Sequence, residues 1–193
     1  RVQGEIASER GRHHSFTRKL KIAHKLQQHE RFYFPHFADF RGRLYPLPQE
    51  LTPQGDKVAK ALLQFADGKA LGVSGLKWLM IHAANTYGMD KESLANREQW
   101  ALDNLEMLRE VSSNPITKRD WTKADEPFGF LAAAKEITEA VALDNPCDYI
   151  SHIPCAMDGT VNGMQILSLM GRDVKGATAT NCTASTERQD LYS

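Results

Sequence analysis

The stretch that decides the fold is YISHIPCAMDGTVNGMQILSLMGRD, residues 149–173. It opens on a short apolar run, reaches the pair Asp158-Gly159 and continues into apolar residues that recur at helical spacing until Gly171. This pattern predicts an extended segment over residues 153–158, a tight turn that carries one carboxylate, and then a helix. The rest of the chain is expected to be organised around this strand, turn and helix.

Asp158 lies at the end of the extended segment, beside small side chains. Side chains alternate along a strand, so the opposite face, which is expected to pack into a core, carries Ile153, Cys155 and Met157. Gly159 lets the backbone approach a ligand closely. A carboxylate in such a place often holds a hard divalent cation, but it can equally serve only to cap the turn. The residues alone leave both interpretations open.

A second motif, rich in aromatic side chains, is FYFPHFADFRGRLYPLP at residues 32–48. Its prolines favour extended chain and turns over helix. If residues 39–43 are extended, Asp39, Arg41 and Arg43 project to one side, and two guanidiniums beside a carboxylate suit the binding of phosphate or sugar. The alternative is a hairpin turn held by an ion pair between Asp39 and an arginine. The residues expected to form an apolar anchor are Phe32, Tyr33, Phe34, Phe37 and Phe40.

Both motifs resemble those of the single-subunit DNA-directed RNA polymerases of bacteriophages and mitochondria. Residues 156–173, AMDGTVNGMQILSLMGRD, are similar to the first catalytic motif of that family, and residues 39–43, DFRGR, are similar to its DxxGR motif. The two motifs stand in the family's order, and the segment between them is also similar. The resemblance covers nearly the whole chain, with the phage branch as the closer likeness.

The resemblance implies a role for each motif residue. Asp158 would bind Mg²⁺ on the polymerase palm, with the backbone carbonyl of Gly159 as a further oxygen ligand. Thr160 and Gln165 would support these ligands without touching the metal. The contacts to nucleic acid, at the hybrid of DNA template and RNA, would come from Asp39, Arg41 and Arg43.

The implied activity is the addition of ribonucleotides to RNA on a DNA template. It uses two Mg²⁺ ions about 3.5–4 Å apart, which two carboxylates must hold. The resemblance places the second carboxylate, and the lysine and tyrosine that handle the incoming nucleotide, after residue 193, so the chain alone is expected to be inactive. The implied partners are the DNA template, nascent RNA, ribonucleoside triphosphates and the remainder of the polymerase chain. The expected location is the cytoplasm of a phage-infected bacterial cell, with the mitochondrion as the alternative.

The chain departs from the phage pattern in the turn after Asp158. Residues 160–163 read TVNG where phage enzymes carry smaller serine and cysteine side chains, and Ile166 stands where a histidine is familiar. The resemblance therefore supports contacts from this turn to the nucleotide ribose less strongly than it supports the role of Asp158.

Charge is balanced overall and uneven along the chain. The 193 residues hold 24 Lys and Arg against 24 Asp and Glu, which gives no global basic field for nucleic acid. Residues 1–31 hold eight basic and three acidic residues, whereas residues 90–141 hold seven basic and eleven acidic ones. We therefore expect one side of the fold to face phosphates and the acidic middle to lie away from them.

Helices are predicted from apolar spacing and from breakers. Further predicted helices lie at residues 56–65, 74–87, 96–111 and 127–145, and another begins at Ser185. Asp173 is expected to pair with Arg172. The basic segment is expected to be a helix capped by Ser15, with lysines that are solvated or near the template and an inner face of Phe16, Leu20, Ala23 and Gln27.

Cysteine pattern and hydropathy argue against other classes of protein. Cys147, Cys155 and Cys182 are odd in number and scattered, which disfavours a disulfide framework or a zinc site and fits a reducing compartment. No apolar run approaches about 18 residues, so neither a membrane span nor a secretory leader is expected. The opening Arg1 and the closing STERQDLYS predict a piece of a longer protein.

The predicted fold class is α+β and mostly helical: the palm portion of a right-hand polymerase, with short antiparallel strands and a helical insertion. The predicted segments are a basic lead-in at residues 1–31, palm with the DxxGR motif at 32–67, a helical palm insertion at 68–148, palm with the catalytic aspartate motif at 149–176 and the start of the fingers at 177–193. Two other hypotheses stay open, a nucleic-acid-binding module without catalysis and a structural fragment that folds only against its missing half.

Overall fold

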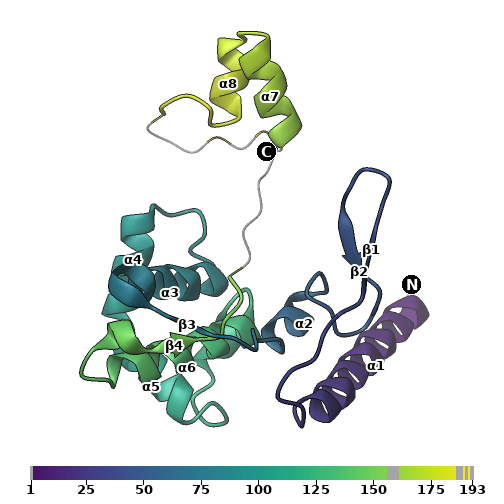
Figure 1. The fold of residues 1–193 in the computed structure, drawn as a ribbon, viewed down its shortest axis with the longest axis vertical. Coiled ribbons are helices and arrows are strands. Elements are labelled where there is room, and N and C mark those ends of the chain that lie inside the picture. The colour runs from purple at the N-terminus through teal and green to yellow at the C-terminus, as the bar shows by residue number, and fades with distance from the viewer. Residues whose placement is uncertain (1, 156–160, 186–188, 190, 192–193) are drawn as a thin grey trace. The chain divides into compact units, whose positions relative to one another are not determined.

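Two compact units, Arg1–Pro154 and Cys155–Ser193, make up the chain in a computed structural model (Figure 1). The structure describes residues 2–155, 161–185, 189 and 191. The first unit is mainly helical and carries two short antiparallel strand pairs. The predicted class, α+β and mostly helical, is confirmed.

The first unit alternates helices with the two strand pairs. Its strands are β1 His36–Ala38 paired with β2 Leu44–Pro46, and β3 Lys69–Ala70 paired with β4 Ile150–Ser151. The pair of β3 and β4 joins the two ends of the helical block, which is the part of the chain between these strands. The helices are α1 Val2–Leu26, α2 Lys57–Ala61, α3 Gly72–Tyr87, α4 Leu94–Asp103, α5 Leu105–Ser113 and α6 Pro127–Val141, with short 3-10 turns η1 Asp120–Lys123 and η2 Pro146–Asp148.

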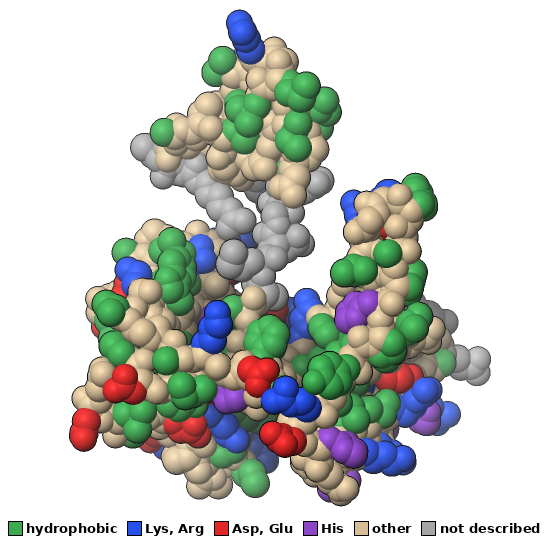
Figure 2. Space-filling view, viewed as in Figure 1, with side chains coloured by type: hydrophobic (Ala, Val, Ile, Leu, Met, Phe, Trp, Pro, Cys, Tyr) green, Lys and Arg blue, Asp and Glu red, His purple; other side chains and the backbone are tan. Residues whose placement is uncertain are grey.

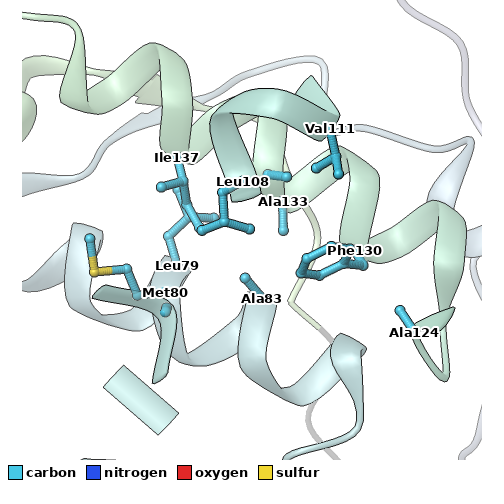
Figure 3. Packing of buried hydrophobic residues seen from close by; sticks show 11 residues of the cluster. Leu79, Met80, Ala83, Leu108, Val111, Ala124, Phe130, Ala133 and Ile137 are labelled. Carbon is cyan, nitrogen blue, oxygen red and sulfur yellow. The ribbon is translucent and has the colours of Figure 1, made fainter. Parts of the chain in front are cut away.

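The main core lies among the helices of the block α3 to α6 (Figure 3). Leu108, Phe130 and Ile137 are completely buried, because the apolar positions of their helices recur on the faces that meet in this core. Pro127 begins α6 as predicted, in the first turn, where its missing N–H is not needed. Gly88 ends α3 with a φ of 121°, also as predicted. The helices predicted at residues 74–87 and 127–145 are therefore confirmed, although α6 ends at Val141.

The single helix predicted at residues 96–111 is two helices in the structure. Asn104 lies between α4 and α5 and leaves the helical conformation, with a φ of −105° and a ψ of 17°. Its side-chain amide donates to the carbonyl of Trp100 at 2.8 Å. Asparagine competes with the helical hydrogen bonds of the backbone in this way, and apolar spacing does not reveal it.

A second, smaller core joins α1 to the segment that contains α2; its buried members are Leu51, Ala59 and Leu63. From α1, Ile22, Ala23 and Leu26 pack against this cluster. Of the predicted inner face of α1, Leu20 is 42% exposed and Gln27 is also exposed. The predicted helix is confirmed, but its inner face is wrong at these two positions, because the cluster meets the face of Ile22 and Leu26.

Lys19 of α1, predicted on the outer surface, is buried. Its Nζ donates to Ser15 Oγ at 2.9 Å and to Asp56 Oδ2 at 2.7 Å. Asp56 in turn caps α2 by accepting from the backbone N–H of Ala59 at 2.9 Å. The Lys19 ammonium holds the pKa of the Asp56 carboxyl below its ordinary value of 3.8. Ser15 lies inside α1 and is not its cap, so that prediction is wrong.

The second unit contains α7 Asn162–Met170 and α8 Val174–Ala179. α7 confirms the helix predicted to end at Gly171, although its apolar side chains are exposed (Figure 2). Asp173 caps α8, which was not predicted, by accepting from the N–H of Lys175 at 3.1 Å, a different role from the predicted pairing with Arg172. The helix predicted from Ser185 falls mostly on residues outside the described part. None of the described helices combines the length and hydrophobicity needed to cross a bilayer.

Candidate functional site

The predicted metal ligands lie outside the described residues. Asp158, Gly159 and Thr160 all belong to residues 156–160, which the structure does not describe. The described residues that flank them in the sequence are therefore taken one unit at a time: residues 149–154 in the first unit, and Cys155 and α7 in the second. The hairpin of β1 and β2, which carries the other motif, belongs to the first unit. These flanks show how the chain is held on the approach to the predicted ligands.

β4 leads toward the site and is fixed on the first unit by backbone hydrogen bonds. Ser151 lies opposite Lys69 in the antiparallel pair of β3 and β4. Beyond this pair, the N–H of Phe65 donates to the carbonyl of His152 at 2.9 Å. The backbone of the approach segment is therefore held through His152.

The structure describes residues 153–155 of the segment that is predicted to be extended, and these three residues do not form a strand. Regular strand ends at Ser151, and residues 152–155 are not in a strand. Ile153 packs against the main core, as its predicted face requires. Cys155 is exposed, so the prediction that it shares a buried face is wrong. The partner strand β3 has only two residues, Lys69 and Ala70, which pair with Ser151 and Ile150, so the regular ladder does not extend past Ser151.

The carboxylate of Glu136, on α6, binds the approach segment from the helical side. It accepts from the hydroxyl of Ser151 and from the backbone N–H of His152, the latter at 3.1 Å. On the other side, the Nδ1 of His152 lies 2.7 Å from the carbonyl oxygen of Phe65. Sequence reasoning missed Glu136, and the available signal was an acid among the apolar positions of a predicted helix.

Tyr149 attaches the same segment to the next turn of α6. Its hydroxyl donates to Glu139 Oε2 at 2.7 Å. Burial, and then this hydrogen bond, raises the pKa of the Tyr149 phenol above its ordinary value of 10.0. Tyr149 therefore stays a neutral donor at physiological pH.

Residues 39–43 form the turn of the β1–β2 hairpin and are not extended. Oδ1 of Asp39 accepts from the backbone N–H groups of Arg41 and Arg43, both at 2.9 Å. Gly42 adopts a φ of 76°, which favours glycine. The hydrogen bond from the Arg43 N–H lowers the pKa of the Asp39 carboxyl below its ordinary value of 3.8, and the hydrogen bond from the Arg41 N–H lowers it further. The prediction of an extended segment is wrong, and the alternative, a hairpin turn with an Asp39–Arg41 ion pair, is confirmed.

The hairpin tip presents an aromatic ring and two guanidiniums to solvent, those of Phe40, Arg41 and Arg43. Figure 2 shows hydrophobic and basic side chains together at the end of this hairpin. Phe40 is 96% exposed, and the Cζ of Arg41 lies 5.5 Å from the centroid of its ring. Arg43 is also exposed. Of the predicted apolar anchor, Phe32 and Phe34 pack against the smaller core, whereas the exposed members are Tyr33, Phe37 and Phe40. The anchor is therefore only partly buried, and the tip is open to a ligand.

The described residues contain no group of three or more His, Cys, Asp or Glu side chains arranged to hold a metal ion. Asp39 closes the hairpin turn and Asp173 caps α8, so both carboxylates serve local structure. The predicted donors, the Asp158 carboxylate and the Gly159 carbonyl, are oxygen ligands of the kind that Mg²⁺ prefers. The chemistry of this predicted donor set fits that ion.

Gln165 of α7 has a structural contact in the second unit. Its Nε2 donates to the carbonyl of Thr180 at 2.8 Å and ties α7 to the end of α8. Gly176 permits the close approach of the two helices, because a Cβ there would clash with the Oγ of Ser168 on α7 and would lie 3.1 Å from the Cβ of that serine. Gln165 thus fixes the helix that follows the predicted ligands.

The chain is similar to known RNA polymerases. A family model described as DNA-dependent RNA polymerase matches residues 69–193. The mitochondrial DNA-directed RNA polymerase of Neurospora crassa is 42% identical over 176 residues, which are 91% of this chain and 12% of that protein. The chloroplastic/mitochondrial DNA-directed RNA polymerase 2 of Arabidopsis thaliana is 41% identical over 91% of this chain and 18% of its own length. The mitochondrial enzyme of Schizosaccharomyces pombe is 43% identical over 92% of this chain and 15% of its own length.

The chain spans between 12% and 18% of the length of these relatives. A single aligned stretch that covers 91% of the chain includes both residues 39–43 and Asp158. The relatives named here are organellar enzymes, in agreement with the mitochondrial alternative for the location. The closer likeness to the phage branch, and a location in a phage-infected bacterial cell, stay predictions.

Proposed function

Because the chain belongs to the family of DNA-dependent RNA polymerases, we propose that the whole protein adds ribonucleotides to RNA on a DNA template. One observation carries this proposal. The family match over residues 69–193 includes the aspartate-glycine pair at 158–159, within the stretch that resembles the first catalytic motif of the family. The partners of the whole protein would be a DNA template, nascent RNA, ribonucleoside triphosphates and the remainder of the polymerase.

Asp158 is the proposed catalytic residue and binds Mg²⁺ through its carboxylate, with the carbonyl of Gly159 as a second oxygen ligand. When bound as a pair, the ions activate the RNA 3′ hydroxyl and stabilise the charge on the departing pyrophosphate. In the sequence these ligands stand between β4, which is fixed on the first unit, and α7 of the second unit. Thr160 and Gln165 support the ligands, and the hydrogen bond from Gln165 that fixes α7 favours this role.

The tip of the hairpin is proposed to contact the hybrid of DNA template and nascent RNA. Arg41 and Arg43 offer exposed cations for phosphates, and the exposed ring of Phe40 offers a surface on which a base can stack. Asp39 acts by closing the turn, because its carboxylate fixes the backbone at both arginines. Its contribution to binding is therefore the orientation of the two guanidiniums.

The segments of the chain are assigned to the polymerase by the same proposal. Residues 32–67 and 149–176 belong to the palm, residues 68–148 to a helical palm insertion, and residues 177–193 to the start of the fingers, with residues 1–31 as the lead-in. For the location we propose the organelle that its relatives occupy, with a phage-infected bacterial cell as the second candidate.

The test uses the full-length protein on a short RNA annealed to a DNA template, without a promoter, so that only elongation is measured. With Mg²⁺ and four ribonucleoside triphosphates, the RNA is expected to grow in the order that the template dictates. Residues 1–193 alone are expected to add nothing, because two carboxylates are needed to hold two ions. No extension by the full-length protein would refute the proposed activity, and extension by residues 1–193 would refute their inactivity.

A nucleic-acid-binding role without catalysis is the second candidate, favoured by the exposed hairpin tip. Fluorescence anisotropy with an RNA–DNA hybrid measures it, and each of Arg41→Ala and Arg43→Ala should reduce the slope of log affinity against log salt by about one. Lys91→Ala, at an exposed site in the acidic block, is the matched control and should leave the slope unchanged. Binding that does not depend on salt would exclude phosphate contacts by the tip.

A further inference from the structure

We propose that a hollow beside Trp121 binds a peptide segment of a partner protein, which places one large apolar side chain in the hollow and a carboxylate against Arg119. The hollow lies in the helical block, between the loop that follows α5 and the helix α6. It belongs wholly to the first unit and shares no residue with either sequence motif, so the inference is independent of the proposed nucleotide addition. Its lining residues are Pro115, Ile116, Arg119, Trp121, Thr122 and Leu131.

The Trp121 hollow is mainly apolar and open to solvent. Its volume of about 410 Å³ is near the lower end of the range of about 300–1,000 Å³ for ligand pockets. Ile116 in its wall is 75% exposed, and Arg119 and Thr122 are also exposed. Small molecules bind where about 70–90% of their surface is buried, and an open hollow does not provide this. It suits an apolar side chain carried by a peptide that runs across the surface.

Hydrogen bonds hold the wall of the hollow in place. Nε1 of Trp121 donates to the carbonyl of Pro115 at 2.8 Å, and the centroid of the Trp121 ring lies 5.5 Å from that of Phe128. The hydroxyl of Thr122 donates to the carbonyl of Arg119 at 2.8 Å. Because the wall is already formed, a ligand loses little free energy in ordering it. Tryptophan and arginine are also the side chains that most often dominate the affinity of protein interfaces.

Arg119 supplies the charge that selects the partner. Its Nε donates to the carbonyl of Ile116 at 2.9 Å, which holds the guanidinium beside the hollow. The ammonium groups of the neighbouring Lys118 and Lys123 each lie 2.7 Å from a carboxylate oxygen. Among the described residues, Arg119 has no carboxylate in such a position. A guanidinium binds a carboxylate through two parallel hydrogen bonds, so the fitting partner carries an acid next to its apolar anchor.

The charge around the hollow disfavours a nucleic acid as its occupant. Residues 90–141, which include the whole hollow, hold seven basic and eleven acidic residues. A nucleic acid brings one negative charge with every phosphate, and an acidic surface repels it. A peptide needs to bring only a single carboxylate to Arg119. The observations therefore favour a peptide with one apolar side chain and one neighbouring acid.

The test measures the fluorescence anisotropy of three labelled peptides of equal length with the full-length protein. Each peptide has a central phenylalanine in a background of glycine and serine, flanked on both sides by aspartates, by asparagines or by lysines. We expect the aspartate peptide to bind about threefold more tightly than the asparagine peptide, and the lysine peptide to bind least. Arg119→Gln should abolish this order, whereas Ile116→Ala should weaken all three peptides and keep it.

The matched control is Arg109→Gln, which removes one exposed positive charge from the same helical block. Arg109 lies on α5 outside the lining of the hollow. We expect its affinities for the three peptides to stay within about twofold of the wild type. If Arg109→Gln abolishes the order as Arg119→Gln does, the preference reflects total charge and the proposal is overturned. Thermal melting of each variant shows that it is folded, and Ile116→Ala provides the test if Arg119→Gln is not.

Other occupants of the hollow give different results. Phenylacetate that displaces the aspartate peptide as well as the unlabelled peptide does would identify a site for small apolar acids. Displacement by single-stranded RNA would identify a nucleic-acid site. A wild-type dimer that Arg119→Gln dissociates, measured by sedimentation velocity, would identify a second copy of the chain as the occupant. Each of these results, or no binding of any peptide, overturns the proposal, and none of them affects the proposed nucleotide addition.

Discussion

Apolar side chains form a buried core in the helical block of α3 to α6, whereas the apolar side chains of the helix α7 are exposed. In the block, Leu79, Leu108 and Ile137 are at most 4% exposed. In α7, Leu167 is 65% exposed and Met170 is 79% exposed. Both regions show apolar residues at helical spacing in the sequence. The spacing therefore predicts that a helix forms, and only its neighbours decide whether its apolar face is buried.

The largest expected contrast is between a truncation in the block and one in α7. Phe130→Ala should lower the free energy of unfolding of the chain by about 3–5 kcal/mol, because it empties a site in the main core. Met170→Ala should cost less than about 0.5 kcal/mol, because its side chain is exposed. Urea unfolding followed by the fluorescence of Trp100, which lies near Phe130, measures both. Equal costs would mean that the two regions do not differ as described.

A smaller effect is expected where the block meets β4. Gly68→Ala should cost about 1–3 kcal/mol, because the new Cβ would lie 2.5 Å from Ile150 Cγ2. Gly11→Ala, on α1, meets no atom within 4 Å and should instead stabilise the chain by about 0.5–1 kcal/mol through helix propensity. The same urea titration distinguishes the two signs. A neutral Gly68→Ala would show that β4 has room to move.

The hydrogen bonds that Asp56 makes between α1 and α2 should contribute a similar amount. Asp56→Ala removes the cap of α2 and one partner of the buried Lys19, and is expected to cost about 1–3 kcal/mol, whereas the exposed Asp144→Ala should be near neutral. Because Lys19 lowers the pKa of Asp56, this contribution is present above pH 3.8 and is lost as the pH falls through the lower native pKa. Thermal melting between pH 3 and 7 measures it. An Asp56→Ala protein with unchanged acid sensitivity would contradict the ion pair.

The smallest effect is expected from His82 of α3. Burial lowers its pKa below the ordinary value of 6.5, so the unfolded chain takes up a proton more readily than the native one. Stability should therefore decrease as the pH falls below 6.5, and His82→Gln should flatten this part of the profile. Melting temperatures between pH 5.5 and 8 measure the slope. An identical slope in both proteins would show that His82 does not contribute to it.

Local chemistry explains which parts of the fold could be predicted from the sequence. Apolar spacing with Gly88 and Pro127 as boundaries predicted α3 and α6. At residues 39–43 the sequence allows two interpretations, although an aspartate three positions before a glycine is typical of a tight turn. The structure shows the turn, because the Asp39 carboxylate accepts hydrogen bonds from the backbone N–H groups of Arg41 and Arg43.

Other features depend on partners far away in the sequence. Lys19 is buried because Asp56 meets it from another helix, and nothing in the charge pattern of α1 marks that lysine. Glu136 stands out in the sequence only as an acid among apolar positions, and that pattern does not indicate its partners, Ser151 and His152, which lie beyond the end of its own helix. The predicted roles of Asp158, Gly159 and Thr160 still rest on motif resemblance, since these residues lie outside the described part of the chain.

Single-turnover nucleotide addition by full-length Asp158→Asn polymerase, measured beside Asp144→Asn, tests the central assignment most directly. We expect the rate of Asp158→Asn to fall by about a thousandfold or more, with Asp144→Asn unaffected. The melting temperature of Asp158→Asn without metal should stay level or rise slightly, because the amide removes repulsion between two acids at the site. An Asp158→Asn enzyme that keeps its rate and loses stability would contradict the assignment, and Asp158 would then be a turn cap.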